Sequence, residues 1–294
     1  MTETPPRLGL IGSPGEFTLA ALQTLLGHGI VPRQVLFAAA PPATPPARAL
    51  PVTPPAAAGP LETLARQHRI PLHHIAHARQ QPRDPVRLPA VDIALVACYP
   101  YRLPTALIHW PQRACINLHP SLLPAYRGPD PVFWQLRDDA PERGVSLHRV
   151  TDTLDAGPLL ARETLHYPSG ASRPALDRLL AGAGTALLIE KLGHWPDLPE
   201  ARPQPAKLAG YRPAPTPADY RLHTDWRVER AFNFIRGTRT PPGGYPLRTE
   251  HGEITLDRAI AFSHGPGFER PAAGDEIELR FSDGLLRAGL REPI

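Results

Sequence analysis

Residues 114–128 read ACINLHPSLLPAYRG, and the apolar first part, Ala114 to Leu118, is typical of a strand buried in a parallel sheet. Asn117 and His119 lie two residues apart at the end of that strand, so their side chains point to the same side. The prolines that follow favour a rigid loop over a helix. Open α/β sheets bind ligands at the carboxyl ends of their parallel strands, so this stretch predicts an amide and an imidazole at the mouth of a pocket.

Strands and helices alternate on both sides of this stretch. Apolar runs predict strands at Leu8–Ile11, Val35–Ala40, Val91–Cys98, Gly144–Val150 and Leu159–Leu165, the last two as a pair. Helices are expected after Gly15, around Leu61–Ala65 and after Ser172. This alternation predicts an α/β fold with a mostly parallel sheet over residues 1–194.

Prolines mark the boundaries of the remaining segments. The sequence contains 40 prolines, with clusters at Pro41–Pro60 and Pro196–Pro217. Such stretches favour extended loops, and the second cluster predicts an interdomain linker at residues 195–217. Beyond it, an expected helix at Val228–Ile235 and β-like pieces separated by glycines predict a smaller, β-barrel-like domain over residues 218–294.

Composition narrows the class of protein. The formal net charge of +4 at pH 7 is compatible with acidic partners such as a folate, a nucleotide sugar or a nucleic acid. Cys98 and Cys115 lack a second cysteine at metal-ligand spacing, and the cluster of His73, His74 and His77 is expected on a solvated surface, so no metal is predicted. Without a membrane-spanning run or a signal-peptide pattern, we expect a cytoplasmic protein with no membrane partner.

A second segment that contains a candidate catalytic residue runs from Gly144 to Gly157. Asp155 precedes Ala156 and Gly157, and a carboxylate beside such a small-residue turn can approach a ligand or a histidine closely. Either motif alone is more often structural, because strand-end histidines are usually hydrogen-bonded and Asp commonly forms turns. Both motifs in one chain, in this order, favour a catalytic site.

Together these residues resemble the folate-dependent formyltransferase family, which includes methionyl-tRNA formyltransferase, glycinamide ribonucleotide transformylase and sugar-nucleotide N-formyltransferases. The family pattern Asn-x-His, then Ser-Leu-Leu-Pro, matches Asn117, His119 and residues 121–124. The signature that begins at a Gly and ends in Asp-x-Gly matches Gly144 and Asp155 to Gly157, although Arg149 replaces a more apolar residue. The resemblance is strong over residues 91–166, and it implies a Rossmann-like domain followed by a smaller β-rich one.

The resemblance also implies an enzyme, a transferase that moves a formyl group from 10-formyltetrahydrofolate to an amine without a metal. Asn117 and a protonated His119 would hydrogen-bond the formyl oxygen, and Asp155 would accept the proton of the attacking amine and favour protonation of His119. By the same resemblance, the residues expected to bind the folate are Tyr99, Tyr101, Arg102, Leu103, Ser121, Leu122, Leu123 and Pro124.

The acceptor is expected to be a small-molecule amine, with a nucleotide-linked amino sugar as the first candidate. Transfer-RNA formyltransferases carry a loop rich in Gly, Arg and Lys where this chain has Pro41–Pro60, in which Arg48 is the only charge. Two alternatives stay open, a methionyl-tRNA formyltransferase and a non-catalytic folate-binding protein. For the first, a compensating basic face could come from Arg221, Arg227, Arg230, Arg236, Arg239 and Arg248.

Overall fold

A computed structural model describes residues 4–38, 59–75, 88–268 and 270–291, and these residues form two compact units. Unit 1 comprises Met1–Arg127, Gly144–Leu165 and Asp177–Gly210, and unit 2 comprises Gly128–Arg143, His166–Leu176 and Tyr211–Ile294. Most of the Pro41–Pro60 loop, including Arg48, lies outside the described residues, as does His77. No helix in the described part of the chain is long and apolar enough to cross a membrane.

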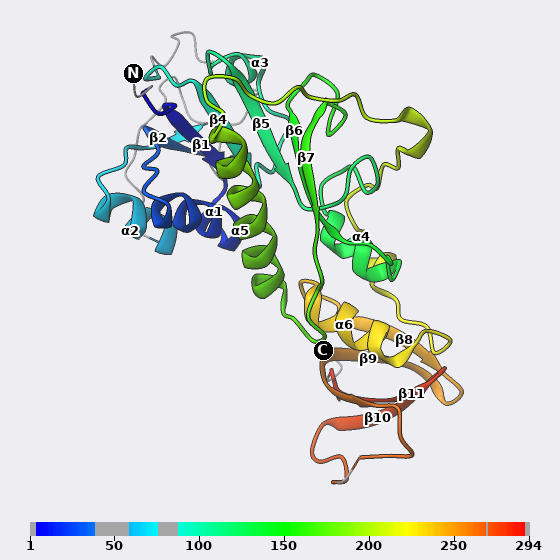
Figure 1. The fold of residues 1–294 in the computed structure, drawn as a ribbon. Coiled ribbons are helices and arrows are strands. Elements are labelled where there is room, and N and C mark those ends of the chain that lie inside the picture. Colours follow the sequence, from blue (N-terminus) through cyan, green and yellow to red (C-terminus); the bar gives the residue numbers. More distant parts are fainter. Residues whose placement is uncertain (1–3, 39–58, 76–87, 269, 292–294) are drawn as a thin grey trace, which may run out of the picture. The chain divides into compact units, whose positions relative to one another are not determined.

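Unit 1 is built on a seven-stranded sheet with the order β3-β2-β1-β4-β5-β6-β7 (Figure 1). Its strands are β1 (Leu8–Gly12), β2 (Gln34–Ala38), β3 (Leu72–Ile75), β4 (Ile93–Ala97), β5 (Ala114–His119), β6 (Gly144–Arg149) and β7 (Leu159–Thr164). Strands β1 to β5 pair in parallel, whereas β6 and β7 are antiparallel. The predicted mostly parallel, Rossmann-like sheet is confirmed.

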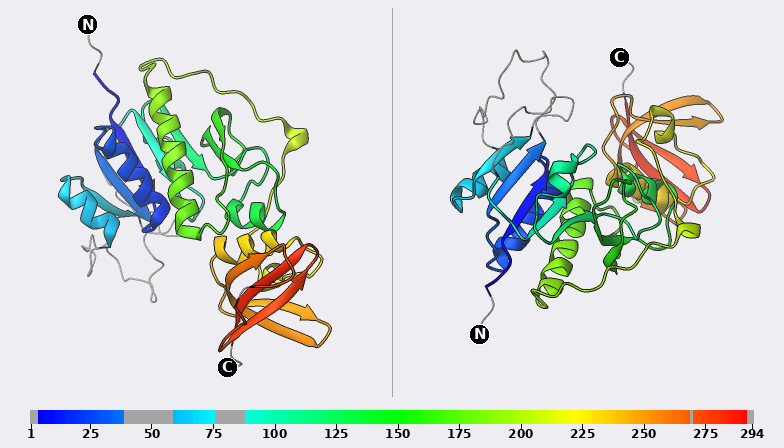
Figure 2. Two further views of the ribbon diagram at one scale, coloured as in Figure 1. Left: turned by 60° about the horizontal axis from the view of Figure 1, so that its bottom comes forward. Right: turned by 90° about the horizontal axis from the view of Figure 1, so that it is seen from above.

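Helices cover this sheet because its central strands are apolar on both faces; every residue of β4 is buried. The helices are α1 (Glu16–Gly27), α2 (Pro60–Gln67), α3 (Thr105–Ile108) and α5 (Arg173–Leu192). Helices α1 and α5 lie side by side on one face (Figure 1, Figure 2). The close approach of α5 requires glycine, because a Cβ at Gly184 would lie 2.7 Å from the side chain of Leu118 in β5.

Unit 2 contains a four-stranded antiparallel sheet with the order β10-β11-β9-β8. Its elements are α4 (Pro131–Arg137), α6 (Val228–Gly237), β8 (Tyr245–Thr249), β9 (Gly252–Ser263), β10 (Glu276–Phe281) and β11 (Gly284–Leu290). Aromatic side chains form its core, with Phe133 of α4 in contact with Phe234 of α6 at 5.2 Å between ring centroids. The small β-rich domain is thus confirmed.

Two features of this division were not expected. Helix α4, which lies between β5 and β6 in the sequence, groups with the C-terminal sheet rather than with the first sheet. Residues 195–210 of the expected linker group with unit 1. The predicted boundaries at residues 194 and 217 stay a prediction, because shared contacts do not test whether a segment folds on its own.

Candidate active site

Asn117 and His148 face each other on neighbouring strands at the edge of the parallel part of the sheet. They are direct partners in the antiparallel register of β5 and β6. The Asn117 amide Nδ2 donates to Nε2 of His148 at 3.0 Å, and His148 Nδ1 lies 2.9 Å from the carbonyl oxygen of Arg149. This pattern places the single proton of a neutral His148 on Nδ1, so that Nε2 is the acceptor.

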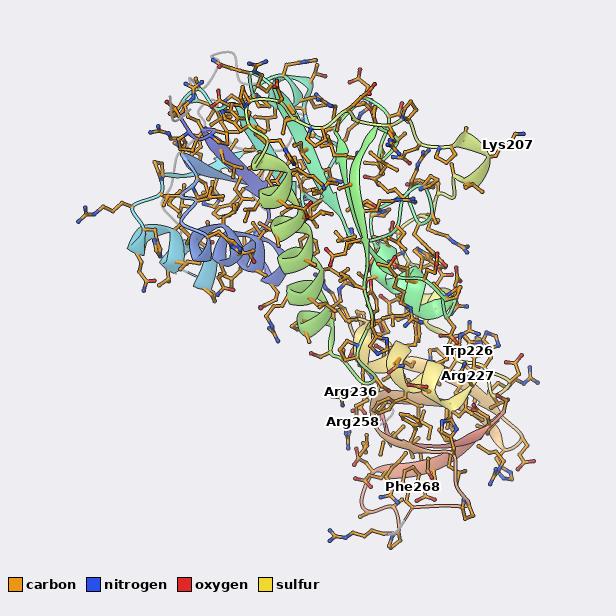
Figure 3. All side chains as sticks on the ribbon, in the orientation of Figure 1. Lys207, Trp226, Arg227, Arg236, Arg258 and Phe268 are labelled. Atoms are coloured by element: carbon orange, nitrogen blue, oxygen red, sulfur yellow. The ribbon has the colours of Figure 1, made fainter. Side chains whose placement is uncertain are left out.

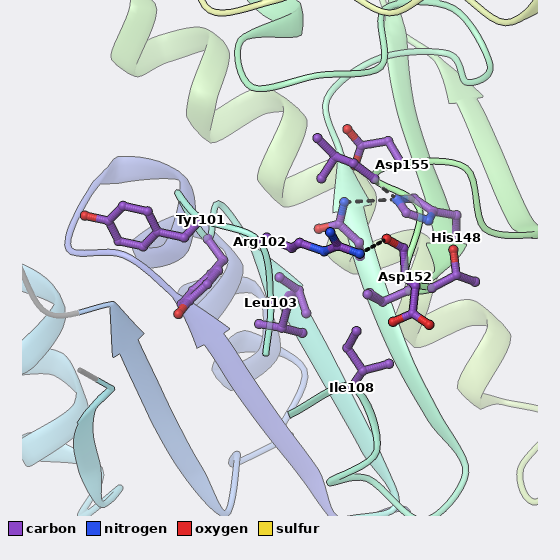
Figure 4. A pocket seen from close by; sticks show the side chains of 13 residues that line it. Tyr101, Arg102, Leu103, Ile108, His148, Asp152 and Asp155 are labelled. Atoms are coloured by element: carbon purple, nitrogen blue, oxygen red, sulfur yellow. Dashed lines mark hydrogen bonds and ion pairs between the residues drawn. The ribbon is translucent and has the colours of Figure 1, made fainter. Parts of the chain in front are cut away.

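Asp155 is buried, although the residues that precede it in the turn after β6 are exposed. Its side chain is only 7% exposed, while residues 151–154 are exposed. Its Oδ1 atom lies 3.6 Å from Nδ1 of His119 and 3.7 Å from Nε2 of His148, and Figure 4 shows the second approach. The backbone of Asp155 adopts φ 51°, in the left-handed region that residues other than glycine rarely occupy. The Asp155 carboxylate therefore lies beside two imidazole rings, on a backbone conformation that has an energetic cost.

His119 is enclosed behind these groups. Its side chain is buried, and Nε2 lies 2.9 Å from the carbonyl oxygen of Tyr126. Burial lowers the pKa of His119 below its ordinary value, although the Asp155 carboxylate and the Tyr126 carbonyl act in the opposite direction. Burial, the largest of these effects, disfavours the charged imidazole. The protonated His119 of the sequence analysis stays a prediction.

A pocket opens beside this cluster in unit 1 (Figure 4). Asn117, His148 and Asp155 line it, whereas His119 does not reach its surface. The other lining residues are Val96, Tyr99, Tyr101, Arg102, Leu103, Ile108, Val150, Thr151, Asp152 and Leu154. The pocket thus combines apolar walls with an amide, an imidazole and a carboxylate at one side, a composition that is usual for small-molecule sites.

The residues expected to bind the folate fall into two groups. Tyr99, Tyr101, Arg102 and Leu103 line the pocket. By contrast, Ser121, Leu122, Leu123 and Pro124 are outside its lining. That loop is held to β6 instead, because Ser146 Oγ donates to the carbonyl of Ser121 at 2.7 Å and accepts from the Leu123 amide at 2.9 Å. A folate contact remains a prediction for both groups.

Comparison with known proteins shows to which family the chain belongs. A family model described as "Formyl transferase" matches residues 50–192. A methionyl-tRNA formyltransferase of Aromatoleum aromaticum is 30% identical over 304 residues, which cover 100% of this chain and 92% of that protein. The chain belongs to the formyltransferase family. It is therefore a member of a family of folate-dependent enzymes that transfer one-carbon groups, as the sequence analysis expected.

Solved structures share the fold of this formyltransferase at low sequence identity. A sugar 3N-formyltransferase crystallised with dTDP and 5-N-formyl-THF has a TM-score of 0.62 and 13% identity, covering 99% of this chain and 100% of that one. A methionyl-tRNA formyltransferase from Clostridium thermocellum has a TM-score of 0.54 and 13% identity, covering 87% and 93%. These likenesses confirm the architecture and leave the acceptor undecided.

Sequence reasoning missed His148. The residue stands inside the segment that begins at Gly144, and its strand was predicted, but nothing local indicates that this strand pairs antiparallel with the strand of Asn117. Only that pairing brings the imidazole opposite the amide. A histidine at the fifth position of the strand that precedes Asp155 was the signal available in the sequence.

Proposed function

We propose that this formyltransferase moves the formyl group of 10-formyltetrahydrofolate to a primary amine at the pocket lined by Asn117, His148 and Asp155. One observation carries the proposal. A buried carboxylate lies within 4 Å of two imidazole nitrogens, with an amide donor beside them, at the polar side of a pocket with apolar walls. Acyl transfer to an amine needs a donor for the developing oxyanion and an acceptor for one proton, and this cluster offers both.

The pocket suits the donor by its chemistry. A tetrahydrofolate has flat, largely apolar faces, and Leu103, Ile108 and Val150 supply matching apolar walls. Leu154 is 50% exposed at the same pocket and offers further apolar surface to a bound ring. Arg102 is an exposed residue of the lining, and its guanidinium, which donates to the carbonyl of Asp152 at 2.6 Å, has further donors for the carboxylates of the donor's glutamate tail. Once bound, the donor supplies an activated formyl group.

Asn117 is proposed as the oxyanion donor. Its amide carries two hydrogens on Nδ2, and one of them is donated to His148. The second can be directed into the pocket, toward the formyl oxygen as negative charge develops on it. Because His148 fixes the rotation of the amide, Asn117 needs little reorganisation during the reaction. A donor of this kind is worth about 3 to 4 kcal/mol in other acyl-transfer enzymes.

Asp155 is proposed as the proton acceptor, with the two histidines in support. Neutral His119 carries its proton on Nε2, which donates to the Tyr126 carbonyl, so its Nδ1 lone pair faces Oδ1 of Asp155. A proton taken from the amine at Oδ1 can then be shared with Nδ1 of His119, and it is returned to N10 of tetrahydrofolate as the bond between N10 and the formyl carbon breaks. On this proposal His119 acts through Asp155 rather than as a direct donor to the formyl oxygen.

For the acceptor, the relatives favour the alternative of the sequence analysis, the amino group of methionyl-tRNA. The relative from Aromatoleum aromaticum that carries this name aligns with 100% of the chain, and further relatives with the same name align with 82% and 90%. Such coverage includes unit 2 as well as the catalytic sheet. We therefore propose methionyl-tRNA as the first acceptor to test; the expectation of a small-molecule acceptor is not confirmed.

A nucleotide-linked amino sugar is the second candidate, and the arginines of unit 2 favour it (Figure 3). Four of them already contact acidic side chains or main-chain carbonyls: Arg221 with Glu253, Arg227 with Glu229, Arg230 with the carbonyl of Arg137 and Arg236 with the carbonyl of Gly170. Phosphate contacts supply most of the affinity for nucleic acid, and each such contact normally uses a basic side chain. Engaged arginines are less able to bind several phosphates.

Separate formylation assays with the two acceptors test the proposal. The purified protein is given 10-formyltetrahydrofolate with methionyl-tRNA or with a nucleotide-linked amino sugar, and the formylated product is measured by mass spectrometry. We expect formyl-methionyl-tRNA, formed more slowly as salt is raised from about 0.05 to 0.2 M. Product from the sugar alone would select the second candidate. No product from either acceptor would contradict the proposed reaction.

A further inference from the structure

Residues Arg202–Gly210, which we call the strap, form main-chain hydrogen bonds with other parts of unit 1 at both ends. Arg202 exchanges two main-chain hydrogen bonds with Leu159 of β7, at 2.7 and 2.8 Å. At the other end, the amide of Gly210 donates to the carbonyl of Pro124 at 3.1 Å, and its carbonyl accepts from the amide of Arg127 at 2.8 Å. The strap therefore runs between the strand that follows Asp155 and the loop that follows His119.

Gln204 is the residue of the strap that forms hydrogen bonds with the turn that contains Asp155. It is half-buried, while Pro203 and Pro205 on either side are exposed. Its Nε2 donates to the carbonyl oxygens of Asp155 and Gly157, both at 2.8 Å. One side chain thus holds the two carbonyls that flank Ala156.

The amide oxygen of Gln204 also accepts two hydrogen bonds. Its Oε1 accepts from Nε of Arg127 at 3.1 Å and from a terminal nitrogen of the same guanidinium at 2.6 Å. Arg127 follows Tyr126, whose carbonyl accepts from His119. Gln204 therefore connects the turn of Asp155 with the loop that positions His119.

The turn needs such support. Asp155 has a left-handed backbone, which non-glycine residues adopt at a cost in energy and keep only where surrounding contacts enforce it. Within the turn itself, the main-chain bond from Ala156 to Thr153 is long, at 3.3 Å. Gly157 is pressed against β6, since a Cβ there would lie 1.8 Å from the carbonyl oxygen of Arg149.

We propose that Gln204 is a positioning residue, which fixes the carbonyls of Asp155 and Gly157 so that the Asp155 carboxylate stays between His119 and His148. The effect of Gln204 on turnover rests on the proposed function of Asp155, but its effect on the geometry of the turn does not. Gln204 has no contact with the pocket, so it acts through Asp155 and not on substrate directly.

Three substitutions of Gln204 distinguish the role of its amide nitrogen from that of its amide oxygen. Gln204→Met keeps the length of the side chain and removes all four hydrogen bonds. Gln204→Lys keeps a donor for the two carbonyls but opposes Arg127, and Gln204→Glu keeps the partner of Arg127 but opposes the carbonyls. Lys207→Met is the matched control, because Lys207 is exposed on the same strap and projects away from the unit (Figure 3).

We expect steady-state kinetics to rank the Gln204 variants by kcat in a defined order. Loss of hydrogen bonds of this kind predicts a fall in kcat of about 10-fold for Gln204→Met, with the KM for 10-formyltetrahydrofolate within about 3-fold of wild type. Gln204→Lys should retain more activity than Gln204→Glu, because the donor end holds the turn. The reverse order, or an equal loss in Lys207→Met, would overturn the proposal.

A double-mutant cycle with Asp155→Asn distinguishes positioning from a general loss of structure. If Gln204 acts through Asp155, then Gln204→Met should change kcat by less than about 2-fold in the Asp155→Asn background. A further loss of about 10-fold in that background would mean that the two residues act independently and would overturn the proposal.

Crystal structures of Gln204→Met and Gln204→Lys give a readout that does not depend on catalysis. We expect Asp155 in Gln204→Met to leave the left-handed region or its carboxylate to move away from His119, and Gln204→Lys to retain both. An unchanged turn in Gln204→Met would overturn the proposal even for an active enzyme. If wild type forms no product with any acceptor, the proposed function fails, and the geometry of these variants still decides the role of Gln204.

Discussion

The substitution Asp155→Asn removes the negative charge that faces both imidazoles and keeps the shape of the side chain. The carboxylate lies 3.6 Å from His119 Nδ1 and 3.7 Å from His148 Nε2, so it is the group best placed to accept a proton from an amine in the pocket. Positioned proton acceptors contribute about 10²- to 10⁴-fold to rate. We therefore expect kcat to fall by about that factor, equivalent to roughly 3 to 5 kcal/mol of transition-state stabilisation.

Formyl transfer measured at saturating donor tests this prediction, with urea unfolding as a check on the fold. The asparagine amide can donate to Nδ1 of His119, so we expect the free energy of unfolding to change by less than about 1 kcal/mol. Asp197→Asn, the same change at an exposed position, is the control and should keep kcat within about 2-fold of wild type. A folded Asp155→Asn variant with kcat within about 3-fold of wild type would refute the assignment of Asp155 as proton acceptor.

Three further predictions concern single groups of unit 1. Burial lowers the pKa of His119 below its ordinary 6.5, so the unfolded chain takes up this proton at higher pH than the folded protein does. The free energy of unfolding should therefore decrease as the pH falls below about 6.5, and His119→Asn should flatten that dependence in urea titrations. Gly157→Ala places a methyl group 1.8 Å from a carbonyl oxygen of β6 and should cost about 2 to 3 kcal/mol of stability by the same method; an unchanged midpoint would contradict the packing. Burial raises the pKa of Cys115 to about 12, so a thiol reagent should modify exposed Cys98 alone in the native protein and both cysteines in urea; rapid native labelling of Cys115 would contradict this.

Much of the fold was predictable because its signals are local. The apolar run from Val91 to Cys98 marks a strand buried on both faces, and β4 occupies Ile93–Ala97. The periodic leucines after Ser172 mark α5, and the glycine-punctuated β-like pieces after residue 245 mark the C-terminal sheet. Helix α4 was missed although its signals are present: Asp130 caps it by accepting from the Phe133 amide, and Pro131 occupies its first turn.

The site was only partly predictable because half of it depends on contacts between distant segments. Asn117 and His119 share a strand, so their common side follows from periodicity alone. His148 joins them through strand pairing, which no local pattern specifies. Gln204 lies among prolines whose composition indicates a linker, and one inward-turned amide does not alter that composition. The protonation state of His119 depends on how completely the fold buries it, which is a property of packing rather than of sequence.

Transfer of a labelled formyl group from 10-formyltetrahydrofolate, in a single turnover with enzyme in excess, tests the central claim most directly. Wild type and Asn117→Ala are compared with methionyl-tRNA and, separately, with a nucleotide-linked amino sugar. The proposed reaction predicts complete transfer by wild type to one of these amines and a rate at least about 100-fold lower for Asn117→Ala. No transfer by wild type, or equal rates for the two proteins, would contradict the assignment of this pocket as the site of formyl transfer.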